Sequence, residues 1–404
     1  MRKFEIVEAS HEPERGQPCP HVRSKAARRT RTWLSALRCR FAVSIFTKHL
    51  PVTAPLFSIL LPTRNRSEIV ADAIRSVLDQ TCGDFEIIVS DNDESPTKTR
   101  DAVAGFTDAR VRYIRTSGNL SMHDNWENAF NQATGDYVFI LEDKQRLVPN
   151  ALEILHHWFK THGPVVISYD IRFARGERID APKLFPHLEK WSSRDAIDHF
   201  CRFEQKFFNI LPKGLDSCAP RKLLAELKAK SPTGMLYSYI SPDYASGFMM
   251  LAAVEHFYYT PAPLVYIPNN WMWQGKYSNG QASFKKTESY RRFLQDLPVT
   301  REEILRDVPL KSEFLWINSV LYDFFKFYRR PDHKSQIDWP RYYGFCIFLI
   351  VMGRKLGADL GEETKLLRTS LALHSFLFKA SVLLNLLERG MGIGWQYLYR
   401  LLRT

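Results

Sequence analysis

Between residues 55 and 170 the chain alternates short apolar runs with amphipathic stretches, and this alternation leaves few folds open. In the first amphipathic stretch, SEIVADAIRSVLDQ, apolar residues recur with the spacing of one helix face, and Ser67 stands at its start as a cap. The apolar runs are PLFSILL, FEIIVS, VRYIRT, YVFILE and VVISYD. Short apolar strands separated by helices predict an α/β fold with a doubly wound, mostly parallel sheet, covered by helices on both faces.

Three polar clusters, TRNR, SDND and EDKQ, directly follow three of these apolar runs. Because parallel sheets bind ligands at the carboxyl ends of their strands, we expect the three clusters to share one rim. No glycine-rich phosphate loop follows the first strand, so side chains must hold a ligand. Asp91 ends the second run, where its carboxylate either accepts hydrogen bonds from a base or sugar or forms an Asx turn that caps the next helix.

The positive charge of the chain is concentrated at its two ends. Residues 1–53 hold 11 Lys/Arg and 4 Asp/Glu, residues 54–300 hold 29 of each, and residues 301–404 hold 16 and 11. A nucleic-acid-binding core would carry its own basic face, so we expect no nucleic acid partner. Basic ends around a neutral middle are typical either of contact with an anionic membrane surface or of a soluble protein with a basic tail.

The cysteines suggest neither a disulfide framework nor a zinc site. All six are scattered without a CxxC pair or a matching histidine cluster. The first 21 residues lack the apolar segment of a secretory signal. We therefore expect a protein of the reducing cytoplasm, where it would lie on the cytoplasmic face of the membrane.

Three parts are expected along the chain: a basic, flexible N-terminal extension at 1–53, an α/β domain at 54–300 and a helical C-terminal region at 301–404. The last part is rich in aromatic and aliphatic residues with Lys or Arg at the borders of its segments. Its longest apolar run, FCIFLIVMG, is far shorter than the roughly 20 residues that a membrane span needs. These segments predict either an ordinary helical subdomain or helices that contact the membrane surface.

Two long stretches resemble a known family. The stretch from PLFSILLPTRNR to SDNDESPT, together with NLSMHDNWENAFNQATGDYVFILEDKQRLVPNAL, is similar to the N-terminal half of family 2 glycosyltransferases, which are inverting nucleotide-sugar enzymes with the GT-A fold. The resemblance covers residues 56–160 well and adds a second patch at 241–280. It implies a GT-A-like sheet, a glycosyltransferase domain at 54–300, a nucleotide-sugar donor of UDP type and a glycan or lipid-linked acceptor in cell-surface polysaccharide synthesis.

The resemblance also assigns roles at the nucleotide end of the site. Pro62, Thr63 and Asn65 fall where the first strand of the family meets the nucleotide, and Asp91 falls where an aspartate binds the base. The DxD-type metal motif of the family falls on Asp143 and its neighbour.

Here the sequence departs from the pattern, since Lys144 occupies the position where the family most often has an acid that binds Mg²⁺ or Mn²⁺. The leaving diphosphate develops negative charge that a cation must meet, and a lysine supplies one positive charge in place. Lys144 therefore either replaces the metal ion or weakens its binding at Asp143. Alternatively, Lys144 points into solvent while Glu142 and Asp143 bind the ion.

An inverting transfer needs a base across the sugar from the diphosphate. By the resemblance, Asp243 in ISPDYASGFMML has this role; the alternative is a helix N-cap. Downstream, Trp271 and Trp273 either line a lid over the donor and acceptor or belong to the core. In the segment before the fourth strand, His123, Asp124 and Asn125 either reach the rim or cap a helix that begins near Ser121.

We therefore expect an inverting glycosyltransferase. A non-catalytic protein that binds a nucleotide sugar or a glycan through a degenerate metal motif is the alternative from another class. A nucleotidyltransferase ranks below both, because LLPTRNRSE has no glycine for a phosphate loop.

Overall fold

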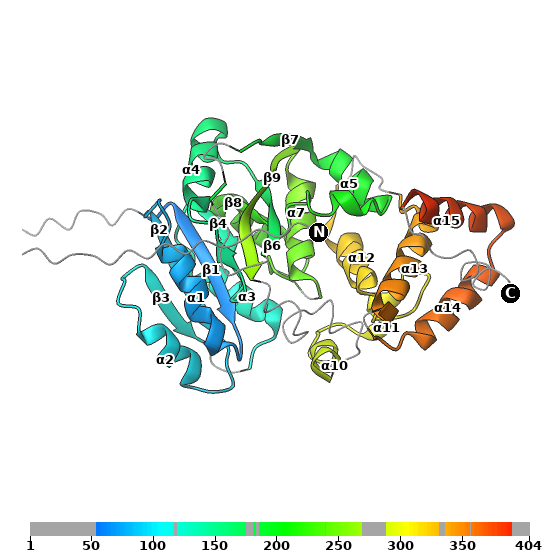
Figure 1. Cartoon of the computed structure of the whole chain (residues 1–404), viewed down its shortest axis with the longest axis horizontal. Helices are drawn as coiled ribbons and strands as arrows, with labels where there is room; N and C mark the ends of the chain where they lie inside the picture. The colour runs from blue at the N-terminus through cyan, green and yellow to red at the C-terminus, as the bar shows by residue number, and fades with distance from the viewer. Residues whose placement is uncertain are drawn as a thin grey trace, which may run out of the picture. The chain divides into compact units, whose positions relative to one another are not determined.

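The computed structural model describes residues 54–116, 119–174, 181–182, 186–238, 240–268, 288–330, 336–355 and 357–389 (Figure 1). The predicted extension at 1–53 and the two tryptophans predicted for the lid, Trp271 and Trp273, lie outside the described residues.

The first half of the domain is a parallel α/β unit, as the alternation predicts. Each strand pairs in parallel with its neighbour in the order β3-β2-β1-β4. Helix α3 packs on β1 and β2, while α1 contacts α2 and β5. The elements are β1 (Phe57–Thr63), α1 (Ser67–Leu78), β2 (Phe85–Asp91), α2 (Lys98–Ala104), β3 (Val111–Arg115), α3 (Met122–Asn131), β4 (Tyr137–Ile140) and β5 (Arg146–Leu147). Ser67 is the first residue of α1 rather than its cap, a position that Arg66 occupies.

The second half turns the sheet into a mixed one of nine strands, in the order β3-β2-β1-β4-β8-β6-β9-β5 with β7 beside β9. Strand β8 runs antiparallel to β4 and β6, and β5 and β7 run antiparallel to β9. The predicted α/β class with flanking helices is confirmed, and its parallel order holds from β3 to β4. The added strands are β6 (Ile167–Ala174), β7 (Glu189–Ser192), β8 (Ser217–Pro220) and β9 (His256–Pro268).

Helices cover both faces of this sheet and continue beyond it. One cluster of buried side chains lies between the sheet and α1, α2 and α4. A second cluster runs without a break from α3 through α5 and α7 into α12 and α13, because α12 packs directly on α7. The remaining helices are α4 (Ala151–His162), α5 (Ser193–Cys201), α6 (Arg221–Lys230), α7 (Pro242–Ala253), α10 (Glu288–Gln295), α11 (Arg301–Leu305), α12 (Trp316–Phe327), α13 (Trp339–Lys355), α14 (Gly361–Ala372) and α15 (Phe376–Glu388).

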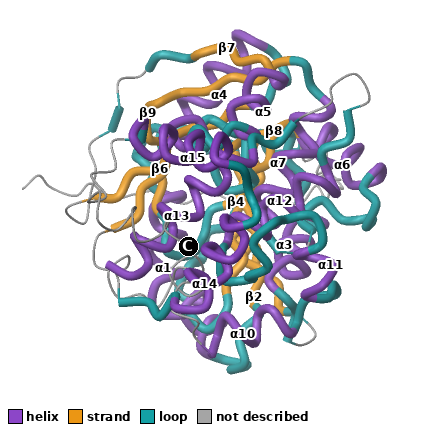
Figure 2. The backbone as a smooth tube through the Cα atoms, turned by 90° about the vertical axis from the view of Figure 1, so that its right-hand side faces the viewer, coloured by secondary structure: helices purple, strands orange, loops and turns teal. Residues whose placement is uncertain are grey.

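The C-terminal segments form the helices that their apolar content predicts. Figure 2 looks from their side of the molecule, with α13, α14 and α15 toward the viewer. Among the described residues, none of these helices has the length and apolar character to cross a bilayer.

Candidate active site

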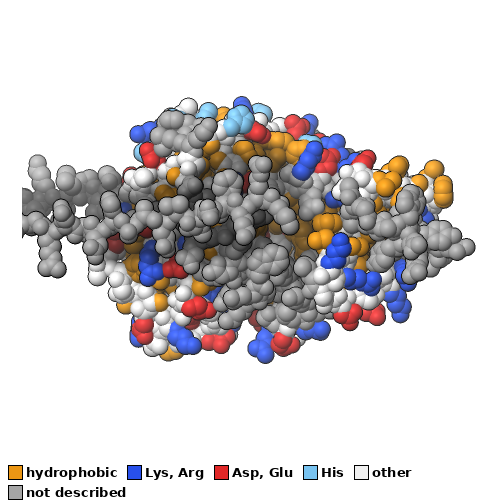
Figure 3. Space-filling view, viewed as in Figure 1, with side chains coloured by type: hydrophobic (Ala, Val, Ile, Leu, Met, Phe, Trp, Pro, Cys, Tyr) orange, Lys and Arg blue, Asp and Glu red, His pale blue; other side chains and the backbone are white. Residues whose placement is uncertain are grey.

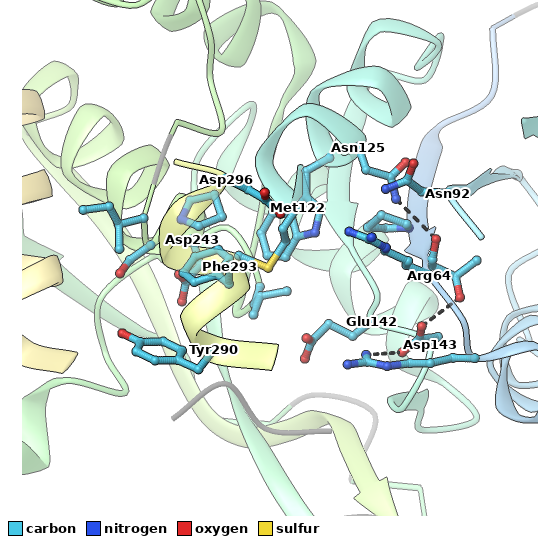
Figure 4. Close-up of a pocket in the computed structure, with 18 of the residues that line it drawn as sticks. Arg64, Asn92, Met122, Asn125, Glu142, Asp143, Asp243, Tyr290, Phe293 and Asp296 are labelled. Atoms are coloured by element: carbon cyan, nitrogen blue, oxygen red, sulfur yellow. Dashed lines mark hydrogen bonds and ion pairs between the residues drawn. The ribbon is translucent and has the colours of Figure 1, made fainter. Parts of the chain in front are cut away.

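A cavity of about 910 Å³ opens where the rim of the parallel strands faces α7, α10 and α12. Its two sides differ in chemistry. Figure 4 shows Arg64, Asn92 and Asp143 on one side, and Asp243, Tyr290 and Phe293 on the other. The rim side contributes Pro62, Thr63, Arg64, Asn65, Arg66, Asn92, Glu94, Asn125, Glu142, Asp143 and Lys144, and the facing side contributes Leu215, Ile240, Ser241, Pro242, Asp243, Tyr244, Tyr290, Phe293, Asp296, Trp316, Ser319 and Val320. The expected convergence of TRNR and EDKQ on one rim is therefore observed.

The turn after β1 is held in one conformation by the loop after β2. Asn65 adopts a left-handed backbone with φ of 56°, a conformation that asparagine tolerates better than most residues. Its side-chain oxygen accepts the backbone N–H of Glu94 at 3.0 Å, and its own N–H donates to the carboxylate of Asp93. This turn brings the side chains of Arg64 and Arg66 to the cavity wall.

Asp143 is buried and already has a cationic partner. Its Oδ2 accepts a hydrogen bond from the Thr63 hydroxyl at 2.8 Å, and its Oδ1 accepts one from the Arg66 guanidinium at 2.9 Å. An arginine paired with a buried carboxylate is a strong, directional interaction. The β1 and β4 ends are thus joined by a Thr63–Asp143–Arg66 cluster that the sequence did not reveal.

Glu142 and Lys144 form the second pair on the rim. The Nζ of Lys144 lies 3.0 Å from Oε1 of Glu142, and both side chains line the cavity. A tight turn supports them, since the N–H of Glu142 donates to the side chain of Gln145, whose own N–H donates back to the Glu142 carbonyl. Lys144 therefore lies at the cavity wall beside Glu142, and its side chain is only 17% exposed.

The two rim acids that could hold a divalent cation are already paired with bases. Mg²⁺ is usually held by one or two carboxylates together with substrate phosphates, and here it would have to displace a basic partner from each carboxylate. Arg66 pairs with Asp143 and Lys144 pairs with Glu142, so each acid of the motif already has a basic partner. Among the described residues, no group of three or more His, Cys, Asp or Glu side chains gathers in a metal-binding arrangement.

Asp91 lies deeper than expected. Its carboxylate is fully buried and accepts hydrogen bonds from the Tyr113 hydroxyl at 2.6 Å, from Arg115 at 2.8 Å and from the backbone N–H of Asp93 at 2.8 Å. Burial is the largest cause that raises the pKa of Tyr113 to about 12, and the hydrogen bond to the Asp91 carboxylate is the second. The cavity is lined not by Asp91 but by Asn92, the next residue along the loop.

Asp243 lies on the facing side, in the first turn of α7. Burial raises the pKa of its carboxyl to about 6, Lys213 opposes this rise, and the negative charges of Asp216 and Glu142 add to it. Because Ser241 occupies the N-cap position and Pro242 begins the helix, Asp243 is not the N-cap. A carboxylate with this pKa is ionised at neutral pH yet able to take up a proton.

The backbone next to Asp243 is packed tightly. The N–H of Gly214 donates to the Asp243 carbonyl at 2.9 Å. A Cβ at Gly214 would stand 2.8 Å from the Ser246 hydroxyl and 3.1 Å from the Tyr237 ring, so a larger residue would require these side chains to shift. The loop before β8 therefore supports the first turn of α7 from one side.

Comparison with known proteins shows which family the segment that carries the rim resembles. A family model described as Glycosyl transferase family 2 matches residues 58–214. This segment belongs to that family. It contains every rim residue named above, from Pro62 to Lys144, whereas Asp243 and the helices α7, α10 and α12 follow it in the chain.

Two bacterial glycosyltransferases are similar to parts of this segment. GalNAc(5)-diNAcBac-PP-undecaprenol beta-1,3-glucosyltransferase of Campylobacter jejuni is 35% identical over 104 residues, which are 25% of this chain and 33% of the relative. The putative colanic acid biosynthesis glycosyl transferase WcaA of Escherichia coli is 30% identical over 142 residues, 34% of this chain and 50% of the relative. The chain thus spans a third to a half of the length of these relatives.

Among solved structures, S. aureus TarS 1-349 in complex with UDP is similar at 13% identity with a TM-score of 0.43, covering 83% of this chain and 92% of that chain.

Two contributions from outside the family 2 segment were not predicted. Helices α10 and α12 add Tyr290, Phe293 and Trp316 to the cavity wall, where the charged residues Glu288 and Arg292 of α10 also lie. On the same helix as Trp316, the fully buried Asp323 accepts the backbone N–H of Ser241 at 2.9 Å. Burial raises the pKa of Asp323 well above its usual value. An aspartate inside the apolar stretch VLYDFF is a sequence signal that would have pointed to it.

Helix α3 shows where Asn125 lies, which the sequence left open between the rim and a helix cap. Ser121 is its N-cap, and its hydroxyl accepts the N–H of Asp124. Asn125 lines the cavity and accepts a hydrogen bond from Ser90 at 2.7 Å, so it reaches the rim and braces β2 at the same time.

Proposed function

We propose that the whole protein is an inverting glycosyltransferase that moves a sugar from a nucleotide-sugar donor of UDP type to a glycan or lipid-linked acceptor in cell-surface polysaccharide synthesis. The observation that carries the proposal is that Asp243, with its raised pKa, and the paired cations Arg66 and Lys144 line one cavity from opposite sides. The family 2 segment on the rim supports the reaction class.

In this proposal Asp243 is the general base. Inversion requires proton removal from the acceptor hydroxyl on the face of the sugar opposite the leaving group. As that oxygen attacks the anomeric carbon, the bond from this carbon to the diphosphate breaks, and the proton passes to the Asp243 carboxylate. The position of Asp243 across the cavity from the rim is consistent with such a line of attack.

The rim residues hold the leaving diphosphate. We assign Pro62, Thr63, Asn65 and Asp143 to the nucleotide end, where Thr63 and Asp143 act mainly by fixing Arg66. Fixed cations stabilise charge that develops as the sugar bond breaks. Arg66 and Lys144 take over the role that a metal ion has in other members of the family, which accounts for the departure from the DxD pattern.

The role of Asp91 stays a prediction. Its three internal donors support an indirect role, in which it shapes the loop that carries Asn92 and Glu94 to the cavity. A direct contact with the base would require Tyr113 or Arg115 to move.

The name of the C. jejuni relative includes an undecaprenol-linked acceptor. By analogy we propose a lipid-linked acceptor here, and with it a place on the cytoplasmic face of an anionic membrane. Residues 54–300 would form the catalytic domain, and 301–404 would complete the acceptor side through α12 and carry the contact with the membrane.

The test is release of free UDP from a panel of UDP-sugars in the presence of an acceptor extract. The proposal expects release with at least one donor and its loss in Asp243→Asn. No release with any donor, together with tight UDP binding, would favour a non-catalytic nucleotide-sugar or glycan binding protein. The observation on its side is that both acids of the metal motif already have basic partners.

A further inference from the structure

The turn between α14 and α15 exposes large apolar side chains to an unusual degree. Leu373 is 85% exposed, Phe376 82% and Leu377 77%, and on the following turns of α15 Leu384 and Leu387 are 61% and 52% exposed. In Figure 3, apolar side chains gather at the end of the molecule where α15 lies. Single exposed leucines are ordinary, whereas a cluster on one turn and one helix face indicates an interaction surface. We call these five residues the apolar tip.

The apolar tip is a well-supported structure rather than a frayed end. Ser375 caps α15 and accepts the N–H of Phe378 at 3.3 Å. The ring of Phe378 stacks on His374 with centroids 4.0 Å apart, and His374 in turn bonds the Tyr343 hydroxyl of α13 at 3.1 Å. Phe378 therefore takes the inward position at the start of α15.

Two turns further, Val382 and Leu386 are buried, so α15 packs through one side only. On its outward face, Phe376, Leu377 and Leu384 are exposed, since no described residue covers them. An exposed apolar helix face with basic residues beside it is typical of a helix that lies in the interface of a bilayer.

Charge around the tip selects the occupant. From Thr364 to Leu387 the sequence contains no Asp or Glu, while Lys365, Arg368 and Lys379 fall in this interval. The next acid, Glu388, pairs with Arg341 at 3.2 Å. Lys365 and Arg368 are exposed and lie within roughly 12 Å of Leu373 along the axis of α14, at 1.5 Å per residue. Long basic side chains at the edge of an apolar surface extend toward lipid headgroups, and anionic lipids attract them.

We propose that the apolar tip inserts into the headgroup and upper acyl region of an anionic lipid bilayer, with Lys365, Arg368 and Lys379 contacting the anionic headgroups. Leu373, Phe376 and Leu377 enter first, and Leu384 and Leu387 follow as α15 lies along the surface. The proposed function includes contact with a membrane, and the inference names the part of the chain that makes this contact. It rests on the proposed function only in this respect.

Vesicle flotation with the purified full chain tests the inference without any need for activity. Vesicles of phosphatidylcholine with phosphatidylglycerol carry the wild-type protein upward, and vesicles of phosphatidylcholine alone carry less of it. The variant Leu373→Ser/Phe376→Ser/Leu377→Ser loses about tenfold or more in partition coefficient, since each buried CH₂ contributes about 0.8 kcal/mol. Lys365→Gln, Arg368→Gln and Lys379→Gln each lower binding to the anionic vesicles about fivefold or less.

Two controls isolate the contribution of the apolar tip. Phe173→Ser removes an aromatic ring that is 51% exposed on β6, and it floats like the wild type. Without vesicles, the triple serine variant keeps the melting temperature of the wild type, because its side chains are exposed near helix ends.

Equal flotation of the triple variant and the wild type overturns the inference. A triple variant with a lowered melting temperature instead identifies another part of this chain as the occupant, and loss of a dimer in light scattering identifies a second copy. An Asp243→Asn protein that lacks activity but still floats shows that membrane binding by the apolar tip does not depend on the proposed activity.

Discussion

The Arg66 guanidinium lies 2.9 Å from the buried carboxylate of Asp143, and the two residues are 77 positions apart in the chain. Beside this pair on the rim, the Nζ of Lys144 lies 3.0 Å from Oε1 of Glu142. Asp243 lies on the other side of the cavity from this rim, so in the proposed reaction the acceptor hydroxyl would approach from the side of Asp243.

Binding of UDP is expected to be independent of divalent metal. Because Arg66 and Lys144 already neutralise the two acids, UDP affinity in EDTA stays within about twofold of that in Mg²⁺ or Mn²⁺, and Arg66→Met weakens it about tenfold, the usual scale for a charge-assisted contact. Isothermal titration measures both. Arg75→Met, on the exposed side of α1, serves as the matched control and leaves affinity unchanged. A large rise in affinity with Mn²⁺ would contradict the arrangement.

Removing the proposed base is expected to stop transfer and spare binding. Asp243→Asn keeps the shape of the side chain and loses the proton acceptor, so kcat falls about 10²-fold to 10⁴-fold while UDP affinity changes little. Asp195→Asn alters an acid in the same first-turn position of α5, outside the cavity, and retains full activity. Normal turnover by the Asp243 variant would remove this residue from the mechanism.

The pH dependence of transfer should report the raised pKa of Asp243. The carboxylate is the active form, so kcat/KM falls as the pH drops through about 6 and levels off above it. Glu142→Gln removes a negative charge that raises this pKa, and its acidic limb moves to lower pH. Initial rates between pH 4.5 and 8.5 measure the limb. A profile that is flat down to pH 5 is incompatible with Asp243 as the base.

Asp323 is expected to act as a neutral acid that supports the first turn of α7. Its folded pKa lies well above the unfolded value, so its ionised form is disfavoured in the fold, and stability falls as the pH rises toward the folded pKa. Asp323→Asn stays neutral and keeps an oxygen for the N–H of Ser241, so its urea midpoint does not fall between pH 6 and pH 8 as that of the wild type does. Asp323→Ala leaves that N–H without its acceptor and lowers the free energy of unfolding by about 1–3 kcal/mol.

Urea unfolding at pH 6 and pH 8 compares the two Asp323 variants. If Asn is as damaging as Ala, the residue is a charged aspartate and the pKa direction is wrong.

The local elements could be read directly from the chain. Apolar periodicity predicts β1 to β4, β6 and the helices between them, because the burial of each short segment depends on its own pattern of side chains. The shared rim of Thr63 and Asp143 followed from topology, since parallel strands present their carboxyl ends at one edge. The departure at Lys144 was visible by comparison with the family pattern.

The order of strands beyond β4 was not visible. Short segments such as Ser217–Pro220 have too few residues to indicate the direction of the strand in the sheet. Their antiparallel pairing depends on partners that lie far away in the chain.

What the sequence by itself determined is which residue types stand at the strand ends and in the first turn of α7, because local pattern and turn chemistry suffice for that. Only the tertiary structure decided how those groups are used: that Arg66 pairs with Asp143, that the oxygens of Asp91 are occupied by Tyr113 and Arg115, and that Asp323 supports the turn of Asp243. The physical reason is that hydrogen bonds and charge pairs depend on distances of about 3 Å between residues that lie far apart in the chain.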